Sequence, residues 1–449
     1  MSIDYSSDDS SCYPKTSYWN ESTNCCSWKG VNCDKASGQV FGLDLSCSLL
    51  VGSLSPNTSP FRLQGLKRLN LASNDFNASP IQSGFIPSDI SLPAKLISLD
   101  LSQNNHLKFD SHSLAMLTRN LSKLQNLFLN SVNMFDVVPT SFNNLPSSLK
   151  RLRLEFCDLK GEFPSEIFQL AYLEHVDLSW NSLTGYLPKS NWSSTLKYFK
   201  LYNNHFGGSI PASIGNLTKI TFLDLSLNEF EGQLPSILFI LKQLPSASLP
   251  THVTGLQNLN EFFLNDNSLT GGITSWPFTL PSLKYLDLSN NSLTGPIDKI
   301  QKPNSVQEGP LLAPLPPSLE EFWISNNNFT GEIPPPICNL TFPQILDLSK
   351  NYLGGIILKC LGSSSYGSRI INLQKNIFKG KIPDFCADYN VVRDQEDAAL
   401  LLYVLARNSM FLEFIFVSSD LKKGFKVDLE DNLHSFLFNL IIRVFAFVN

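Results

Sequence analysis

A pattern that recurs about every 24 residues limits the fold of this chain more than any other feature. It reads L-x-x-L-x-L-x-x-N/C-x-L followed by G-x-I-P, and it is clearest in LEHVDLSWNSLTGYLP from Leu173. The thirteen copies start at Val40, Leu66, Leu96, Leu124, Leu149, Leu173, Leu196, Ile220, Leu259, Leu283, Leu319, Pro343 and Ser368. One such repeat cannot bury its apolar face alone, so a sustained period predicts a stacked solenoid. At 449 residues the chain is also too long for one ordinary compact core.

The L-x-L segment of each repeat predicts one short strand. Alternation with period two places Val176 and Leu178 inside the coil and their neighbours outside. The Asn slot lies where the chain leaves the strand, and a side-chain amide there can bond the backbone of adjacent coils. The slot residues are Asn74, Asn104, Asn181, Asn204, Asn228, Asn267, Asn291, Asn327, Asn351 and Asn376, with Cys157 as a substitute.

The repeat divides the chain into three parts. Residues 1–39 form a partial cysteine-containing cap, residues 40–385 form the solenoid of about thirteen coils, and residues 386–449 form a non-repeat tail. Two repeats are longer than the rest. The extra residues, near 236–256 and 299–316, are rich in Pro and Ser and are predicted to be loops.

Cysteines and glycosylation sequons indicate an oxidising, extracellular environment. Four of the nine cysteines lie within the first 33 residues. The Asn-x-Ser/Thr triplets begin at Asn20, Asn57, Asn77, Asn120, Asn191, Asn216, Asn290, Asn328 and Asn339. The first residues contain neither a basic nor an apolar stretch. We therefore expect that a signal peptide is missing from this sequence.

Three disulfides are expected from the cysteine positions. Cys26 and Cys33 bracket a Trp-containing loop and are expected to pair, with Cys12–Cys25 as a second bridge. Cys338 and Cys360 are separated by close to one coil, which is within disulfide reach. Cys47 and Cys157 lie in or beside the buried turn and are expected to be inert thiols.

Candidate binding residues occupy the solvent-facing positions of four consecutive strands. In most coils these positions carry the polar residues of the pattern x-D-L-S, which keep the sheet soluble and are called filler below. Here aromatic and charged residues replace them. The replacements are Phe128, Arg151, Arg153, Glu155, Phe156, His175, Trp180, Tyr198, Lys200 and Tyr202. Exposed aromatic rings with Arg are typical of interface hot spots, although such rings can also simply cover aliphatic neighbours. Phe263, Tyr285 and Trp323 form a second, weaker group.

Enzymatic and nucleic-acid functions find little support. The chain has no H-E-x-x-H, no G-x-S-x-G, no phosphate-binding glycine loop and no C-x-x-C pair, so no catalytic residue, metal or cofactor is predicted. The formal net charge of −5 is spread without blocks, which gives no footprint for a nucleic acid.

Three stretches resemble plant leucine-rich-repeat receptor-like proteins of the disease-resistance type, of which the tomato leaf-mould resistance proteins are examples. The stretches are YPKTSYWNESTNCCSWKGVNCDKASGQVFGLDLSCSLLVGSL, LKRLNLASNDFNASPI and ICNLTFPQILDLSKNYLGG. The resemblance covers roughly residues 3–385. It implies an α/β solenoid: a right-handed, plant-type superhelix with a parallel concave β-sheet and a disulfide-bonded N-terminal cap.

The resemblance also implies a function. Such proteins are glycosylated, non-enzymatic ectodomains at the extracellular face of the plasma membrane, which sense protein or peptide ligands, some pathogen-derived, and signal through co-receptor kinases. Two alternatives remain: a secreted protein similar to polygalacturonase inhibitors, and a non-functional gene remnant. Thirteen coils, two insertions and no closing cap argue against the inhibitor.

The tail departs from the resemblance, since related proteins continue with more repeats and a membrane helix. Its first apolar stretch, 398–417, contains Arg407 and Glu413, and the second, 436–448, is short and contains Arg443. Neither is a good spanning helix. We expect a truncated or mis-spliced sequence here, with a membrane-associated helix as the alternative.

Overall fold

The computed structural model describes most of the predicted solenoid. The described residues are 2–3, 12–52, 54, 59–76, 85–235, 256–273, 280–297, 318–339, 345–362, 370–379 and 401–403. The insertion predicted near 299–316 lies outside these ranges, as does all but the last residue of the one near 236–256. Of the tail, only 401–403 is described.

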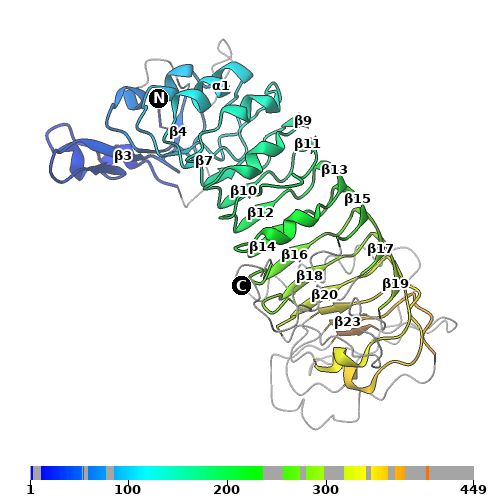
Figure 1. Ribbon diagram of the computed structural model, residues 1–449. Helices are drawn as coiled ribbons and strands as arrows, with labels where there is room; N and C mark the ends of the chain where they lie inside the picture. Colours follow the sequence, from blue (N-terminus) through cyan, green and yellow to red (C-terminus); the bar gives the residue numbers. More distant parts are fainter. Residues whose placement is uncertain are drawn as a thin grey trace, which may run out of the picture.

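One sheet of fifteen strands runs the length of the solenoid in chain order (Figure 1). Apart from the antiparallel pair at its start, its strands are parallel. They are β2 (Val31–Cys33), β3 (Val40–Asp44), β5 (Arg68–Asn70), β6 (Ser98–Asp100), β7 (Asn126–Phe128), β8 (Arg151–Arg153), β10 (His175–Asp177), β12 (Tyr198–Lys200), β14 (Phe222–Asp224), β16 (Glu261–Phe263), β18 (Tyr285–Asp287), β20 (Glu321–Trp323), β22 (Ile345–Asp347), β23 (Ile370–Asn372) and β24 (Leu401–Tyr403). The fold is the leucine-rich-repeat solenoid that the sequence predicts.

The last strand extends this sheet beyond the predicted end of the solenoid. Leu401–Tyr403 pairs in parallel with β23, with Leu401 beside Ile370. The repeat pattern predicts an end of the solenoid at residue 385, because the tail lacks the Asn slot and the G-x-I-P segment. Backbone pairing needs neither, since any extended segment can add to a sheet edge.

A second sheet, which the sequence did not predict, has seven strands. They are β9 (Lys160–Glu162), β11 (Ser182–Gly185), β13 (His205–Ser209), β15 (Glu229–Gln233), β17 (Ser268–Gly272), β19 (Ser292–Pro296) and β21 (Asn328–Thr330). Each follows the slot residue of its coil within three residues, so the two sheets form two rows of strands along the stack (Figure 1). Gly208 has φ +72 in this row, and a Cβ there would lie 2.8 Å from Tyr186 Cδ1.

Short helices and turns complete the coils. The α-helix of the described ranges, α1 (Ser111–Asn120), is preceded by the N-cap residue Asp110, whose side chain accepts from Ser113 N. The 3-10 turns are η1 (Lys15–Tyr18), η2 (Cys25–Ser27), η3 (Ser59–Arg62), η4 (Ser88–Ser91), η5 (Pro139–Asn144), η6 (Ser165–Gln169), η7 (Ala212–Asn216), η10 (Pro335–Asn339) and η11 (Lys359–Gly362). Near the N-terminus β1 (Ser2–Ile3) pairs with β4 (Leu50–Val51). No helix in the described ranges has the length and apolar character needed to cross a bilayer.

Asparagines hold neighbouring coils together below the main sheet. Asn204 Nδ2 donates to Leu178 O of the preceding coil (2.9 Å) and to Leu201 O of its own coil (3.0 Å). Its Oδ1 accepts from Leu183 N (3.0 Å). Other slot asparagines repeat this pattern, and in the fifth coil Cys157 Sγ lies 3.1 Å from Leu129 O instead. The side chain in the slot therefore supplies hydrogen bonds to backbone groups that have no partner in a regular strand ladder.

The disulfides differ from the expectation in one pairing. Cys26–Cys33 and Cys338–Cys360 are bonded as expected, but Cys12 pairs with Cys47 and not with Cys25. Cys47 was expected to be an inert thiol, and that prediction is wrong. Ser48, not Cys47, fills the slot of the first coil and is fully buried. Cys47 has φ 50 and lies one residue earlier, so its side chain leaves the core.

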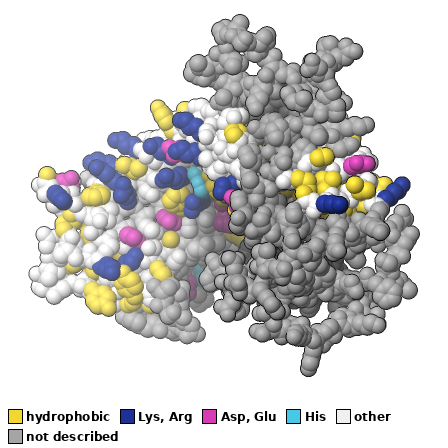
Figure 2. Space-filling view, turned by 90° about the horizontal axis from the view of Figure 1, so that it is seen from below, with side chains coloured by type: hydrophobic (Ala, Val, Ile, Leu, Met, Phe, Trp, Pro, Cys, Tyr) yellow, Lys and Arg dark blue, Asp and Glu magenta, His cyan; other side chains and the backbone are white. Residues whose placement is uncertain are grey.

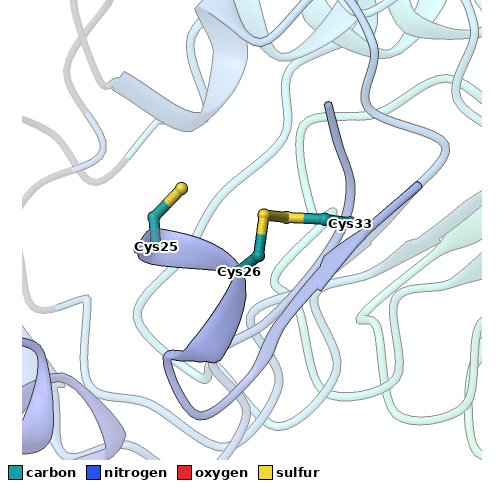
Figure 3. Close-up of side chains that lie close together, drawn as sticks. All are labelled: Cys25, Cys26 and Cys33. Carbon is teal, nitrogen blue, oxygen red and sulfur yellow. A yellow bond between two sulfur atoms is a disulfide. The ribbon is translucent and has the colours of Figure 1, made fainter. Parts of the chain in front are cut away.

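Cys25 remains a thiol beside the Cys26–Cys33 bond (Figure 3). The Sγ atoms of these three cysteines lie within 4.8 Å of one another. Among the described residues, no other group of potential metal ligands is as close together. Two of the three sulfurs are already bonded to each other, so the group does not fit a thiolate metal site. Within the described ranges Cys157 is the other free cysteine, and it is buried.

Candidate ligand-binding surface

The solvent-facing side of the main sheet, called the concave face below, carries its side chains in straight rows. Strand register places Arg151 beside His175, His175 beside Tyr198, and Tyr198 beside Phe222. Two residues further along each strand, a second row contains Phe128, Arg153, Asp177, Lys200 and Asp224. The candidate residues from sequence therefore lie together, because parallel pairing repeats the same position from coil to coil.

Three rings of the first row stack on one another. The centroids of His175 and Tyr198 are 4.1 Å apart with their planes 4° from parallel, and those of Tyr198 and Phe222 are 4.3 Å apart at 9°. Phe222 was not among the residues predicted from sequence, since the rest of its strand reads as filler. Its position before the L-x-L segment, equivalent to His175 and Tyr198, was the available signal. The stacked rings cover each other's faces, so their edges point to solvent.

His175 fixes Arg153 in place. Arg153 Nε donates to His175 Nε2 at 3.1 Å, and its guanidinium lies 5.4 Å from the Phe128 ring centroid. Burial, with a contribution from Arg153, lowers the pKa of His175 to about 4. The imidazole is therefore neutral above that pH and acts as an acceptor, which leaves it unsuited to serve as a general base near neutral pH.

The most exposed rings among the candidate residues lie at the turn that follows the strands. Phe156 and Trp180 stack with centroids 5.0 Å apart, and Tyr202 meets Trp180 edge-on at 5.3 Å. Phe156 is 55% exposed and Trp180 39%. Both have φ 56, a conformation that is uncommon for bulky residues and that turns these side chains outward. Lys200 Nζ lies 5.4 Å from the centroid of Tyr202.

We call this set the aromatic–basic surface. It consists of Phe128, Arg151, Arg153, Phe156, His175, Trp180, Tyr198, Lys200, Tyr202 and Phe222. Figure 2 shows Lys and Arg side chains gathered over part of the described surface, together with a histidine. Because its rings already support one another, this surface loses little side-chain entropy when a partner covers it.

Acidic side chains beneath the surface have a structural role. Asp177 is 7% exposed and Asp224 5%. Oδ1 of each accepts from the backbone N–H and the hydroxyl of the serine two residues later, Ser179 or Ser226. Burial raises the pKa of Asp224. The filler sequence D-L-S thus fixes the turn after the strand. Glu155, predicted as a binding residue, is half-buried, and burial raises its pKa too.

The second group from sequence is not a patch of touching rings. In strand register Tyr285 lies between Glu261 and Glu321, and Asp287 lies between Phe263 and Trp323. Burial raises the pKa of Asp287 to about 6 and that of Glu321 to about 7. Phe263 is also 5.9 Å from Phe222 between ring centroids, so the second group adjoins the aromatic–basic surface.

The sequon asparagines with described side chains are exposed. These are Asn20, Asn120, Asn191, Asn216, Asn290 and Asn328. Asn57 and Asn77 lie outside the described residues, as does the side chain of Asn339. Asn290 occupies the turn after β18, four strands from Trp180 in the sheet order. None of these six belongs to the aromatic–basic surface.

Comparisons with known proteins agree with this fold. The Leucine Rich Repeat family model matches residues 172–193, 195–217, 282–302 and 318–340. A receptor-like protein Cf-9 homolog of Solanum lycopersicum is 39% identical over 212 residues, which are 43% of this chain and 25% of that protein. Receptor-like protein 6 of Arabidopsis thaliana is 38% identical over 206 residues, 40% of this chain and 21% of that protein. The chain thus resembles Cf-9-type plant receptor-like proteins and spans about a quarter of their length.

Solved structures share the solenoid at lower identity. A TDR receptor superposes with a TM-score of 0.53 and 24% identity, covering 81% of this chain and 63% of that one. The plant peptide hormone receptor RGFR1, solved in complex with RGF2, gives a TM-score of 0.50 and 23% identity, covering 78% and 68%. These similarities show the architecture.

Proposed function

We propose that this chain is the ligand-binding part of a plant cell-surface receptor-like protein in defence or developmental signalling. Its ligand is a protein or peptide, of pathogen or plant origin, and its signalling partner is a co-receptor kinase. The observation that carries the proposal is the aromatic–basic surface on β7, β8, β10, β12 and β14. Similarity to receptor-like proteins and to peptide-hormone receptors supports it.

The composition of the surface favours contact with a protein partner over the alternative that these side chains only keep the sheet soluble. Trp, Tyr and Arg provide most of the binding energy in typical interfaces, and truncating one such hot spot costs about 2 kcal/mol or more. Here Trp180, Arg153 and Tyr202 lie within three neighbouring strands. Each is held by another side chain before any partner arrives, which favours binding by reducing the entropy lost.

Disulfides and exposed sequons support an extracellular location. The described chain contains three disulfides, which persist in oxidising compartments. We propose N-linked glycans at the sequon asparagines, with the plasma membrane reached through the longer protein. Glycans at the six exposed positions would leave the aromatic–basic surface free.

Replacing Trp180 and Arg153 together by Ala tests the proposal. The probe is extracellular fluid from healthy and infected leaves, passed over the secreted, immobilised chain and analysed by quantitative mass spectrometry. A matched control replaces Tyr172 and Lys219, an exposed ring and an exposed cation that lie outside the main sheet.

We expect at least one polypeptide to be retained by the unmodified chain and the control and to be lost from the double variant. Thermal unfolding of the three proteins should agree within about 2 °C, because exposed side chains contribute little to stability. Retention that is equal on all three proteins would contradict the assignment of the surface.

A further inference from the structure

The N-terminal cap brings three sulfur atoms together. Cys25 and Cys26 lie in η2 and Cys33 ends β2, with Cys26 bonded to Cys33 and Cys25 free as a thiol. Their Sγ atoms all lie within 4.8 Å of one another. Figure 3 shows the Cys25 and Cys26 side chains leaving η2 on the same side. All three residues are half-buried, so the thiol lies close to a disulfide that solvent also reaches.

Contacts that involve no sulfur atom hold η2 in its conformation. Asn24 Oδ1 accepts from Cys26 N at 2.9 Å. After the turn, Trp28 stacks on Trp19 with ring centroids 4.9 Å apart, and its Nε1 donates to Thr23 Oγ1 at 2.9 Å. These contacts remain when the disulfide changes partner, so η2 continues to present both of its cysteines to Cys33.

One exchange reaction is favoured by the covalent geometry. The Cys25 thiolate attacks Cys33 Sγ, so that the Cys25–Cys33 bond forms as the Cys26–Cys33 bond breaks. The electron pair of the broken bond leaves on Cys26 Sγ, which takes up a proton, and no oxidant or reductant is consumed. Attack on Cys26 Sγ would join adjacent residues, whose Cα atoms are about 3.8 Å apart, less than the roughly 4.4–6.8 Å that disulfides span.

The two alternative bonds close loops of nearly equal length. Cys26–Cys33 has a sequence separation of 7, and Cys25–Cys33 has one residue more. If chain entropy sets the difference, the two populations change by only about 1.2-fold. Loop closure therefore excludes neither partner, and local contacts decide how Cys33 divides between them.

The structure also provides an acceptor for the thiol that the exchange releases. Cys26 Sγ lies 3.6 Å from Gly38 O. While it is bonded to Cys33, this sulfur has no hydrogen to donate. Once released, the Cys26 thiol can donate to Gly38 O from the position that it already occupies.

Cys157 is the contrasting case. It is fully buried, and this burial raises the pKa of its thiol strongly. Its thiolate, which is the form that attacks disulfides, is therefore scarce. Cys25 is half-buried and lies beside a bond that it can attack.

We propose that Cys25, Cys26 and Cys33 form a thiol–disulfide exchange site, in which Cys33 alternates between Cys26 and Cys25. The free thiol of the cap is presented by Cys25 in one isomer and by Cys26 in the other. The exchange shifts by one residue the point at which η2 is tied to β2, the first strand of the main sheet. This site uses no residue of the aromatic–basic surface, so it is independent of the proposed ligand-binding function.

Thiol labelling of the full secreted chain tests the proposal. The chain is held at about pH 8.5, where ordinary thiols ionise, and is then made mildly acidic and labelled with N-ethylmaleimide. After removal of any glycan at Asn20, trypsin releases residues 16–29 still linked to residues 30–35. Fragmentation of the backbone between Cys25 and Cys26 identifies which of them carries the label.

We expect the label on both residues, each with at least about a tenth of the total, because loop closure separates the isomers by only about 1.2-fold. Label confined to Cys25 would overturn the proposal. The matched control Cys157→Ser removes a buried thiol and should leave the distribution between Cys25 and Cys26 unchanged.

The variant Cys26→Ser provides a second measurement. Cys25 should then bond Cys33, so the linked peptides should be recovered without label. Recovery of Cys12 linked to Cys47 shows that the cap has folded. With that bond intact, label on both Cys25 and Cys33 would overturn the proposal. Labelling of the unmodified chain decides the matter even where Cys26→Ser does not fold.

Discussion

Replacing Asn204 by Ala should destabilise the solenoid strongly, although the side chain is small and polar. The amide donates to two carbonyls, Leu178 O and Leu201 O, and accepts from Leu183 N, at 2.9–3.0 Å. Three such bonds contribute about 3 kcal/mol to the free energy of unfolding. Leaving the Leu183 N–H buried without an acceptor adds about 1 kcal/mol, so we expect a loss of about 4 kcal/mol.

Two other substitutions calibrate this value. Cys157 occupies the same slot, but its thiol has one hydrogen to donate and contacts only Leu129 O at 3.1 Å and Glu155 O at 3.4 Å, so Cys157→Ala should cost about 1–2 kcal/mol. Asn143 is exposed in η5, so Asn143→Ala should cost less than about 0.5 kcal/mol. The order of the three losses follows from the number of hydrogen bonds removed.

Urea unfolding followed by circular dichroism measures the three free energies, and amide hydrogen exchange locates the change. In Asn204→Ala, hydrogen exchange should accelerate at the Leu183 amide and at backbone amides of the two adjacent coils. A loss below about 1 kcal/mol for Asn204→Ala, or a loss equal to that of Cys157→Ala, would refute the argument from hydrogen-bond count.

Two further predictions concern pH and the cap. Because the folded-state pKa of Glu321 is raised to about 7, its ionisation opposes folding: the favourable contribution is complete below the unfolded pKa and is lost as the pH rises through about 7. Glu321→Gln should therefore stabilise the protein at pH 8, by about 1 kcal/mol after allowing for screening, and have little effect at pH 4, as calorimetry at both values can show. In the cap, non-reducing peptide mapping should recover Cys12 linked to Cys47, and Cys47→Ala should lower the unfolding midpoint of the cap; a Cys12–Cys25 peptide would contradict the observed pairing.

The residues of a single repeat specify the conformation of one coil. Alternation in L-x-L set which side chains enter the core, and the Asn slot set which backbone groups are bonded, since both depend on residues within one repeat. Val176 and Leu178 are fully buried accordingly. The same period placed the candidates from Phe128 to Tyr202 on one face, because each coil adds one strand in a fixed register.

Contacts between coils cannot be derived from one repeat and follow only from the folded chain. Whether Phe222 stacks on Tyr198, and whether Tyr285 meets rings or carboxylates, follows from residues 24–36 positions apart in the chain, which no local pattern relates. The partner of Cys12 depended on the one-residue difference that puts Ser48 in the slot and turns Cys47 outward. Periodicity fixes the frame of a solenoid, but the chemistry of its surface arises where adjacent coils meet.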